Sequence, residues 1–271
     1  MTDPQNAVTT PSAAPDAAAA AALAGERLRL VAVSTGHLLD SAAGLKSEAL
    51  AEPSALPGWT RGHVLAHLAR NADSLVNLLD GARTGTDIPQ YADGGARDRD
   101  IEAGAGRPLD VHLDDLRESD RNFTSAAALL PDEAWTAEMR HRTGYLFPAY
   151  DLPWKRLMEV EYHHVDLDAG YTPAHWPEVF AVAEFRRLSA GLAGAEGLPA
   201  VELVSDDTAD RARIGADQGT AGAAALTVEG PVRALTAWLS GRSDGDGLQV
   251  HRGGEQLPDG RAALPALPPL G

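Results

Sequence analysis

Residues 60–82, TRGHVLAHLARNADSLVNLLDGA, decide the fold of the first half of the chain. Thr60 is a residue type that accepts hydrogen bonds at a helix N-cap, so we expect a helix to begin there. The apolar side chains that follow recur at the three- and four-residue spacing of one helical face: Val64, Leu65, Leu68, Leu75, Leu78 and Leu79. The stretch therefore predicts a long helix that buries one face.

Three further stretches show the same helical spacing. They cover about residues 19–43, 109–130 and 153–168, and a proline at the start of the last is compatible with a helix N-terminus. Four long helices with one apolar face each predict a four-helix bundle. Residues 83–107 are rich in glycine, and we expect them to form a long loop of the kind that is usually functional or mobile.

The pattern changes in the last hundred residues. A helix at about 177–193 and a second at 232–240 are expected between short β-like runs at 201–205, 211–216, 225–228 and 248–252. Mixed strands and helices predict a small α+β domain. The domain organisation expected is a disordered Ala/Pro-rich tail at 1–22, a metal-binding helix bundle at 23–172 and an α+β domain at 173–271.

Composition excludes several functions. The chain has 39 acidic and 23 basic residues, a formal net charge of -16, which disfavours binding to nucleic acids or anionic membranes. It has no cysteine, so any thiol chemistry requires a thiol from a cosubstrate. The N-terminal stretch has neither a basic region nor a long branched-apolar run. We expect a cytoplasmic monomer that acts on a small molecule, without a nucleic-acid or membrane partner.

Two pairs of candidate metal ligands occur at helical spacing. His63 and His67 are four residues apart in the quoted stretch, and Glu159 and His163 are four apart in a later helix, followed by His164. Residues four apart share a helix face, and bundle cores often hold metals between facing helices. Two imidazoles and one carboxylate suit catalytic zinc or another divalent ion. Either pair alone also occurs as ordinary surface or core polar residues, so both interpretations stay open.

Asn71 follows His67 by four residues and shares its helix face. It is a candidate for a contact to substrate, and equally for a buried polar side chain bonded to the backbone. The metalloprotease motif His-Glu-x-x-His is absent from the sequence.

The motifs resemble those of the mycothiol-dependent maleylpyruvate isomerases of actinobacteria, within a DinB-like superfamily of bundles linked to mycothiol and bacillithiol. The resemblance covers about residues 26–271. It implies a DinB-like four-helix bundle followed by a small, sterol-carrier-like α+β domain. It rests on LPGWTRGHVLAHLARNADSLVNLL (56–79), NLLDGARTGTDIPQY (77–91), YADGGARDRDIE (91–102), MEVEYHHVDL (158–167) and VEGPVRALTAWLSGR (228–242).

The resemblance also implies site residues. Transferred by position, the zinc ligands of the family fall on His67, Glu159 and His163, whereas His63 and His164 lie outside the ligand set. The essential arginine of the family corresponds to Arg242, which follows Gly241 after the 232–240 helix. A second arginine, Arg97 in the GGAR of the loop, corresponds to a candidate for binding a substrate carboxylate.

The activity implied is the cis-to-trans isomerisation of maleylpyruvate to fumarylpyruvate in gentisate degradation, with mycothiol and a divalent metal as cofactors. In this mechanism a thiolate adds reversibly to the double bond, the resulting single bond rotates, and elimination gives the trans isomer. Two alternatives remain. One is a mycothiol S-transferase of the same fold acting on another electrophile, and the other is a non-catalytic zinc-binding regulator.

Overall fold

The computed structural model describes residues 14–216 and 226–268, and the chain divides into one unit up to His163 and a second from His164 onward. The boundary expected from the sequence lay after residue 172. The first thirteen residues of the expected tail lie outside the described residues. The part of that tail from Ala17 to Ala22 is helical, so the expectation of a disordered segment up to residue 22 was wrong there.

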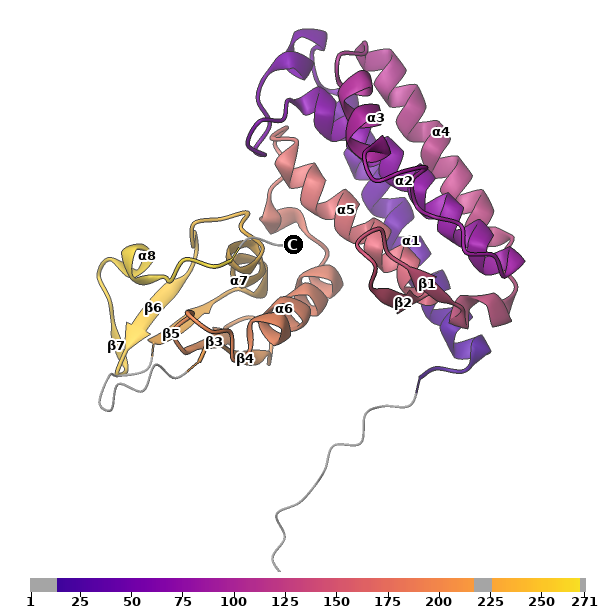
Figure 1. Ribbon diagram of the computed structural model, residues 1–271. Helices are drawn as coiled ribbons and strands as arrows, with labels where there is room; N and C mark the ends of the chain where they lie inside the picture. The colour runs from indigo at the N-terminus through magenta and orange to yellow at the C-terminus, as the bar shows by residue number, and fades with distance from the viewer. Residues whose placement is uncertain (1–13, 217–225, 269–271) are drawn as a thin grey trace, which may run out of the picture. The chain divides into compact units, whose positions relative to one another are not determined.

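The first unit is built on four long helices, as predicted: α1 (Ala17–Ala43), α2 (Arg61–Thr84), α4 (Leu109–Ala128) and α5 (Leu152–Asp166). Figure 1 shows these four helices running side by side. Their inward faces bury apolar side chains with no exposed area, among them Leu65, Leu68, Phe123 and Leu157. Polar contacts also join the helices, since the hydroxyl of Ser34 on α1 donates to Glu161 of α5.

Side-chain caps explain where two of these helices begin. The Asp16 carboxylate accepts the N–H of Ala19 at 2.8 Å, so α1 starts at Ala17, two residues before the start expected at about residue 19. Thr60 caps α2, as predicted, because its hydroxyl oxygen accepts the N–H of His63. The short helices η1 (Ser47–Ala51), η2 (Asp132–Thr136) and η3 (Ala149–Asp151) complete the connections in this unit.

The expectation of a continuous loop over 83–107 was wrong, because α3 (Ala96–Ala105) lies within it. Small residues let α3 approach α2 closely. A Cβ atom added to Gly62 would lie 2.1 Å from the carbonyl oxygen of Ala105, and one added to Gly104 would lie 2.9 Å from the Cβ of Ala66. Any side chain at Gly62 or Gly104 would therefore push the two helices apart.

A short hairpin between α4 and α5 was not anticipated. Strands β1 (Glu138–Arg140) and β2 (Leu146–Pro148) pair in antiparallel register, with Met139 opposite Phe147. Both of these side chains are buried, whereas the residues between the strands are mostly exposed. Strands of three residues give too short an alternation to be recognised from sequence.

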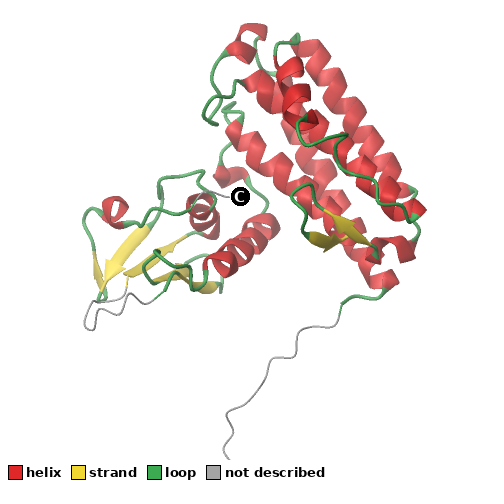
Figure 2. Cartoon of the chain, in the orientation of Figure 1, coloured by secondary structure: helices red, strands yellow, loops and turns green. Residues whose placement is uncertain are grey.

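The second unit has the α+β architecture that the sequence predicted. The elements are η4 (Pro173–His175), α6 (Glu178–Leu192), β3 (Val201–Ser205), β4 (Arg211–Ile214), β5 (Leu226–Gly230), α7 (Val232–Leu239), β6 (Gln249–Arg252), β7 (Glu255–Gln256) and α8 (Gly260–Ala263). The sheet has the strand order β4-β3-β5-β6-β7, in which β3 and β5 are parallel and the other neighbours antiparallel. Helices α6 and α7 contribute the side chains that pack on the apolar residues of the strands, with Phe185 and Trp238 in this core. Figure 2 separates these helices from the strands by colour.

Two strand boundaries differ from expectation. β4 ends at Ile214 rather than residue 216, because Gly215 adopts a positive φ of 71° and leaves the strand. β5 extends to Gly230, whereas the expected first residue of this strand, Ala225, lies outside the described residues. Over the residues described, no helix is both long enough and apolar enough to cross a membrane.

Candidate metal centre

Helices α2 and α5 bring together the three residues that the resemblance indicated as metal ligands. The Nε2 atom of His67 lies 2.8 Å from Oε2 of Glu159, and Nε2 of His163 lies 3.3 Å from the same oxygen. Ligand atoms of all three side chains lie within 4.8 Å of one another. The two imidazole rings are perpendicular, with their centroids 4.6 Å apart. The sequence could give the spacing of these residues within each helix, whereas only the fold shows that His67 of α2 lies next to Glu159 and His163 of α5.

The electrostatics of this cluster suit a cation. Burial, reinforced by the charge of His163, lowers the pKa of His67 to about 4, so its imidazole is neutral near pH 7. Burial alone would raise the pKa of Glu159, but hydrogen bonds from His163 and His67 hold it well below its usual range. Neutral imidazoles and an ionised carboxylate are the protonation states that metal binding requires.

The second ring nitrogen of His67 is unpartnered in the described part of the chain. Nδ1 of His67 is buried without a hydrogen-bond partner among the described residues, and the side chain is only 4% exposed. A buried polar atom without a partner costs free energy, so packing alone gives no reason for an imidazole here. The other ring nitrogen, Nε2, is hydrogen-bonded to Oε2 of Glu159. The donor set of two imidazoles and one carboxylate therefore fits a divalent ion.

A buried arginine supports the cluster from inside the bundle. Arg156, three residues before Glu159 on α5, has no exposed area, and its Nη1 donates to the carbonyl oxygen of Leu68 at 2.8 Å and to Oδ1 of Asn71 at 3.0 Å. Asn71, which is 6% exposed, thus bonds to a side chain of the bundle interior. This bond links α5 to α2 one turn from the ligands, whereas a contact between Asn71 and substrate stays a prediction.

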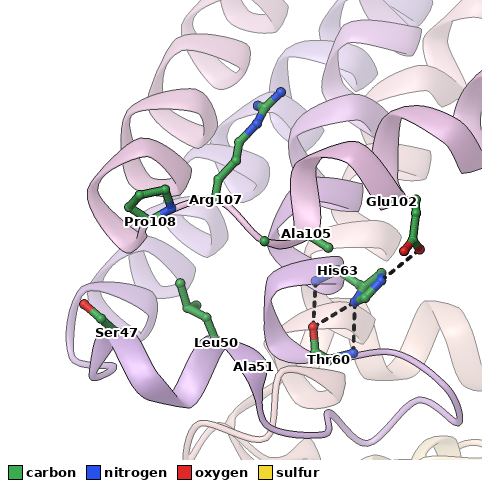
Figure 3. A pocket seen from close by; sticks show the side chains of 10 residues that line it. Ser47, Leu50, Ala51, Thr60, His63, Glu102, Ala105, Arg107 and Pro108 are labelled. Carbon is green, nitrogen blue, oxygen red and sulfur yellow. Dashed lines mark hydrogen bonds and ion pairs between the residues drawn. The ribbon is translucent and has the colours of Figure 1, made fainter.

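His63 lies one turn before His67 but faces elsewhere. Its Nδ1 accepts the backbone N–H of Thr60 at 3.2 Å, and its Nε2 lies 3.2 Å from Oε2 of Glu102 on α3 (Figure 3). His63 lines a cavity of about 540 Å³ with residues of η1, of α3 and of the segment between α3 and α4, and none of the three cluster residues lines it. His164 is also occupied elsewhere, because its ring stacks on Tyr171 with centroids 3.6 Å apart.

Arg97 lies on the cluster side of α3. Its guanidinium is 5.7 Å from the centre of the Trp59 ring, and Trp59 in turn packs edge-on against His67 with centroids 5.4 Å apart. The charge of Arg97 contributes to lowering the pKa of His67. Nη1 of Arg97 also forms an ion pair with Oδ1 of its exposed neighbour Asp98, at 2.7 Å. Trp59 thus lies between Arg97 and His67, whereas a contact between Arg97 and substrate stays a prediction.

Arg242 belongs to the second unit, where it forms a two-bond ion pair. Its Nη2 donates to Oδ2 of Asp166 at 2.8 Å and its Nε donates to Oδ1 at 3.2 Å, while Nη1 donates to the carbonyl oxygen of Ser240 at 2.8 Å. The Arg242 and Asp166 side chains are 14% and 4% exposed. Sequence reasoning missed Asp166, although it lies three residues after His163 within the quoted MEVEYHHVDL stretch.

Fold and site together define a class of protein: a four-helix bundle with a two-histidine, one-carboxylate cluster, carrying an α+β unit. The sequence model described as the mycothiol maleylpyruvate isomerase N-terminal domain matches residues 31–168, just over half of the chain. The chain belongs to the mycothiol maleylpyruvate isomerase N-terminal domain family.

Solved structures extend the similarity to more of the chain. A crystal structure of the mycothiol-dependent maleylpyruvate isomerase matches with a TM-score of 0.77 and 27% sequence identity, covering 84% of this chain and 92% of that one. A variant of that enzyme, in which a histidine is replaced by alanine, matches with a TM-score of 0.76, at the same identity and coverage. A search of curated proteins gave no match.

Proposed function

We propose that this chain is a mycothiol-dependent isomerase that converts maleylpyruvate into fumarylpyruvate, a step in the degradation of gentisate. The observation that carries the proposal is its likeness, over 84% of its length, to the mycothiol-dependent maleylpyruvate isomerase. That likeness reaches beyond the bundle, since the bundle family model alone accounts for residues 31–168.

In this proposal His67, Glu159 and His163 hold a divalent metal, and zinc suits three such ligands with one position left open. When bound, the metal supplies a Lewis acid that keeps a thiol ionised near neutral pH. The low pKa of His67, which burial lowers to about 4, keeps this imidazole available as a ligand. The bond between Arg156 and Asn71 keeps α2 and α5 aligned so that the histidines converge.

The chemistry explains why the chain needs no cysteine of its own. A carbon–carbon double bond does not rotate at a useful rate, so isomerisation requires that it become temporarily single. Reversible formation of a carbon–sulfur bond achieves this, and its cleavage after rotation releases the trans product with the thiol unchanged. Mycothiol is then needed in catalytic amounts only.

Two arginines are assigned to the negative charge of the substrate. Guanidinium groups bind carboxylates through two parallel hydrogen bonds, and they stabilise charge that develops on an oxygen during thiol addition. Arg97 is assigned to a substrate carboxylate because it lies beside the cluster. Arg242 is assigned to the developing charge, with Asp166 fixing the orientation of its guanidinium.

A coupled assay of fumarylpyruvate formation, with and without mycothiol, tests the proposal. We expect turnover only with mycothiol, many turnovers per mycothiol molecule, and loss of activity in a strong chelator. If mycothiol is consumed in step with substrate and a conjugate accumulates, an S-transferase replaces the isomerase. Full activity without thiol would overturn the proposal entirely.

A further inference from the structure

The β1–β2 hairpin is held at the level of the metal cluster by contacts from both sides. Lys155 lies on α5 one helical turn before Glu159, and its Nζ donates to the Tyr145 hydroxyl at 2.8 Å. The same ammonium is 4.3 Å from the centre of the Phe147 ring of β2. The turn residues of the hairpin therefore sit next to the helix face that carries Glu159.

A second anchor fixes the backbone of the hairpin turn. Oε1 of Gln90 accepts the backbone N–H of Arg142 at 2.6 Å, while the carbonyl oxygen of Gln90 accepts from Asn77 of α2 at 3.0 Å. Gln90 is itself 6% exposed, so its side of both bonds is buried. This places Arg142 next to Tyr91, the residue that follows Gln90.

The side chain of Arg142 differs from its neighbours in having no acidic partner. It is exposed, and over residues 14–216 and 226–268 its guanidinium takes part in no ion pair. Arg140, two residues earlier on the same hairpin, pairs with Asp87 at 3.9 Å. In a chain of net charge -16, an unpaired arginine beside a cluster is available to an external anion.

The field around Tyr91 connects Arg142 to the cluster. Burial raises the pKa of Tyr91; a hydrogen bond with Ser74 opposes this, the charge of Glu159 adds to it, and the charges of Arg97 and Arg142 lower it. Burial and the charges of Lys155 and Arg142 lower the pKa of His141, on the hairpin turn, while the charge of Glu159 opposes them. The charges of Arg142 and Glu159 therefore both act on Tyr91.

We propose that Arg142 is a specificity-determining residue that binds a carboxylate of a small dicarboxylate substrate beside the metal cluster. The inference rests on the proposed function and adds a recognition element that lies wholly in the first unit. In this proposal Arg97 on α3 and Arg142 on the hairpin meet the substrate from different elements. Two such groups select a dianion over a monoanion, because each carboxylate is paired.

Arg142→Gln tests this inference, with Arg140→Gln as the matched control on the same hairpin. The first measurement is the binding of maleate and of monomethyl maleate to the metal-loaded protein by calorimetry, without mycothiol. We expect the wild type and Arg140→Gln to prefer maleate, and Arg142→Gln to lose about 10- to 100-fold in maleate affinity. The monoester should bind all three proteins alike.

The second measurement is turnover of maleylpyruvate. Because the carboxylate keeps its charge throughout the reaction, Arg142→Gln should raise KM by a similar factor and change kcat little. Arg142→Lys should recover part of the loss. If Arg142→Gln and Arg140→Gln behave alike, or if the monoester loses as much affinity as maleate, the inference is overturned.

The two measurements separate this inference from the proposed function. Maleate binding requires no turnover, so a preference for the dianion that depends on Arg142 supports the inference even if maleylpyruvate is not converted. Conversion of maleylpyruvate with an unchanged KM in Arg142→Gln would leave the proposed function standing and remove Arg142 from it.

Discussion

Replacing His63 and His67 by alanine, one at a time, separates a helix cap from a metal ligand. The two histidines lie one turn apart on α2 and have the same chemistry, so each variant is the control for the other. His67 points to Glu159 across the bundle, whereas His63 bonds to Thr60 and Glu102. We expect only the His67 variant to lose metal.

The structure sets the size of each effect. His63→Ala removes the acceptor for the N–H of Thr60, which is worth about 1 kcal/mol in the free energy of unfolding. The pair with Glu102 adds little because that carboxylate is 80% exposed. His67→Ala removes one of the three proposed protein ligands. Loss of a residue that only orients a ligand costs roughly 10- to 100-fold in metal affinity, so loss of the ligand itself should cost more than 100-fold.

The assay is metal content after dialysis against a buffered zinc solution, followed by chelator competition to obtain the affinity. Thermal unfolding of both variants in chelator measures stability without metal. His63→Ala should hold about one metal ion per chain and unfold at a slightly lower temperature than wild type. Equal loss of metal from the two variants would contradict the choice of His67 over His63 as the ligand, and retention by His67→Ala would refute the ligand assignment directly.

Three other outcomes follow from the structure. Arg242→Ala should lower turnover by roughly 100-fold while metal content is unchanged. Because the change removes the guanidinium that pairs with the buried Asp166, the free energy of unfolding should also fall by about 3 kcal/mol. Near-normal turnover in a steady-state assay would leave Arg242 a purely structural residue. Arg156→Met should destabilise the bundle by about 2 kcal/mol in denaturant unfolding, because it leaves the buried Oδ1 of Asn71 and the carbonyl oxygen of Leu68 without their donor. An unchanged midpoint would contradict this. Burial lowers the pKa of His112 below its ordinary value of 6.5, so the folded state should lose stability as the pH falls below that value. His112→Gln should flatten this part of the curve of unfolding free energy against pH. A curve identical to that of the wild type would count against the assignment.

The four bundle helices could be predicted because each carries an apolar face long enough to show its period. The residues of α2 illustrate this, since Leu65, Leu68 and Leu75 are all buried at the spacing seen in the sequence. The ligand pairs were visible for the same reason, because residues four apart share a face. Only the resemblance to a family selected His67 over His63, and the structure supplies the reason: Thr60 and Glu102 hold His63 elsewhere.

Elements held by contacts distant in sequence could not be predicted. The sequence of α3, ARDRDIEAGA, is polar and contains glycine, so it has little apolar periodicity of its own. Its helix depends on close packing against α2. Asp166 and Arg242 are 76 residues apart, and no local pattern connects them. Arg142 was also missed, because an exposed arginine in a turn carries no signal until the fold shows that it has no acidic partner.

The close contact of Gly62 with Ala105 has a mechanical consequence. It fixes the last turn of α3, whereas Arg97 sits near the other end, seven residues before Gly104. At 1.5 Å per residue, the length of helix from Gly104 to Arg97 is about 10 Å, so a tilt of α3 by roughly 10° at the contact would move Arg97 by about 2 Å. A displacement of that size at a reacting centre can cost on the order of 100-fold in rate. If Arg97 binds a substrate carboxylate as proposed, a single methyl group added at Gly62 would therefore disturb the alignment of the substrate through the tilt of α3.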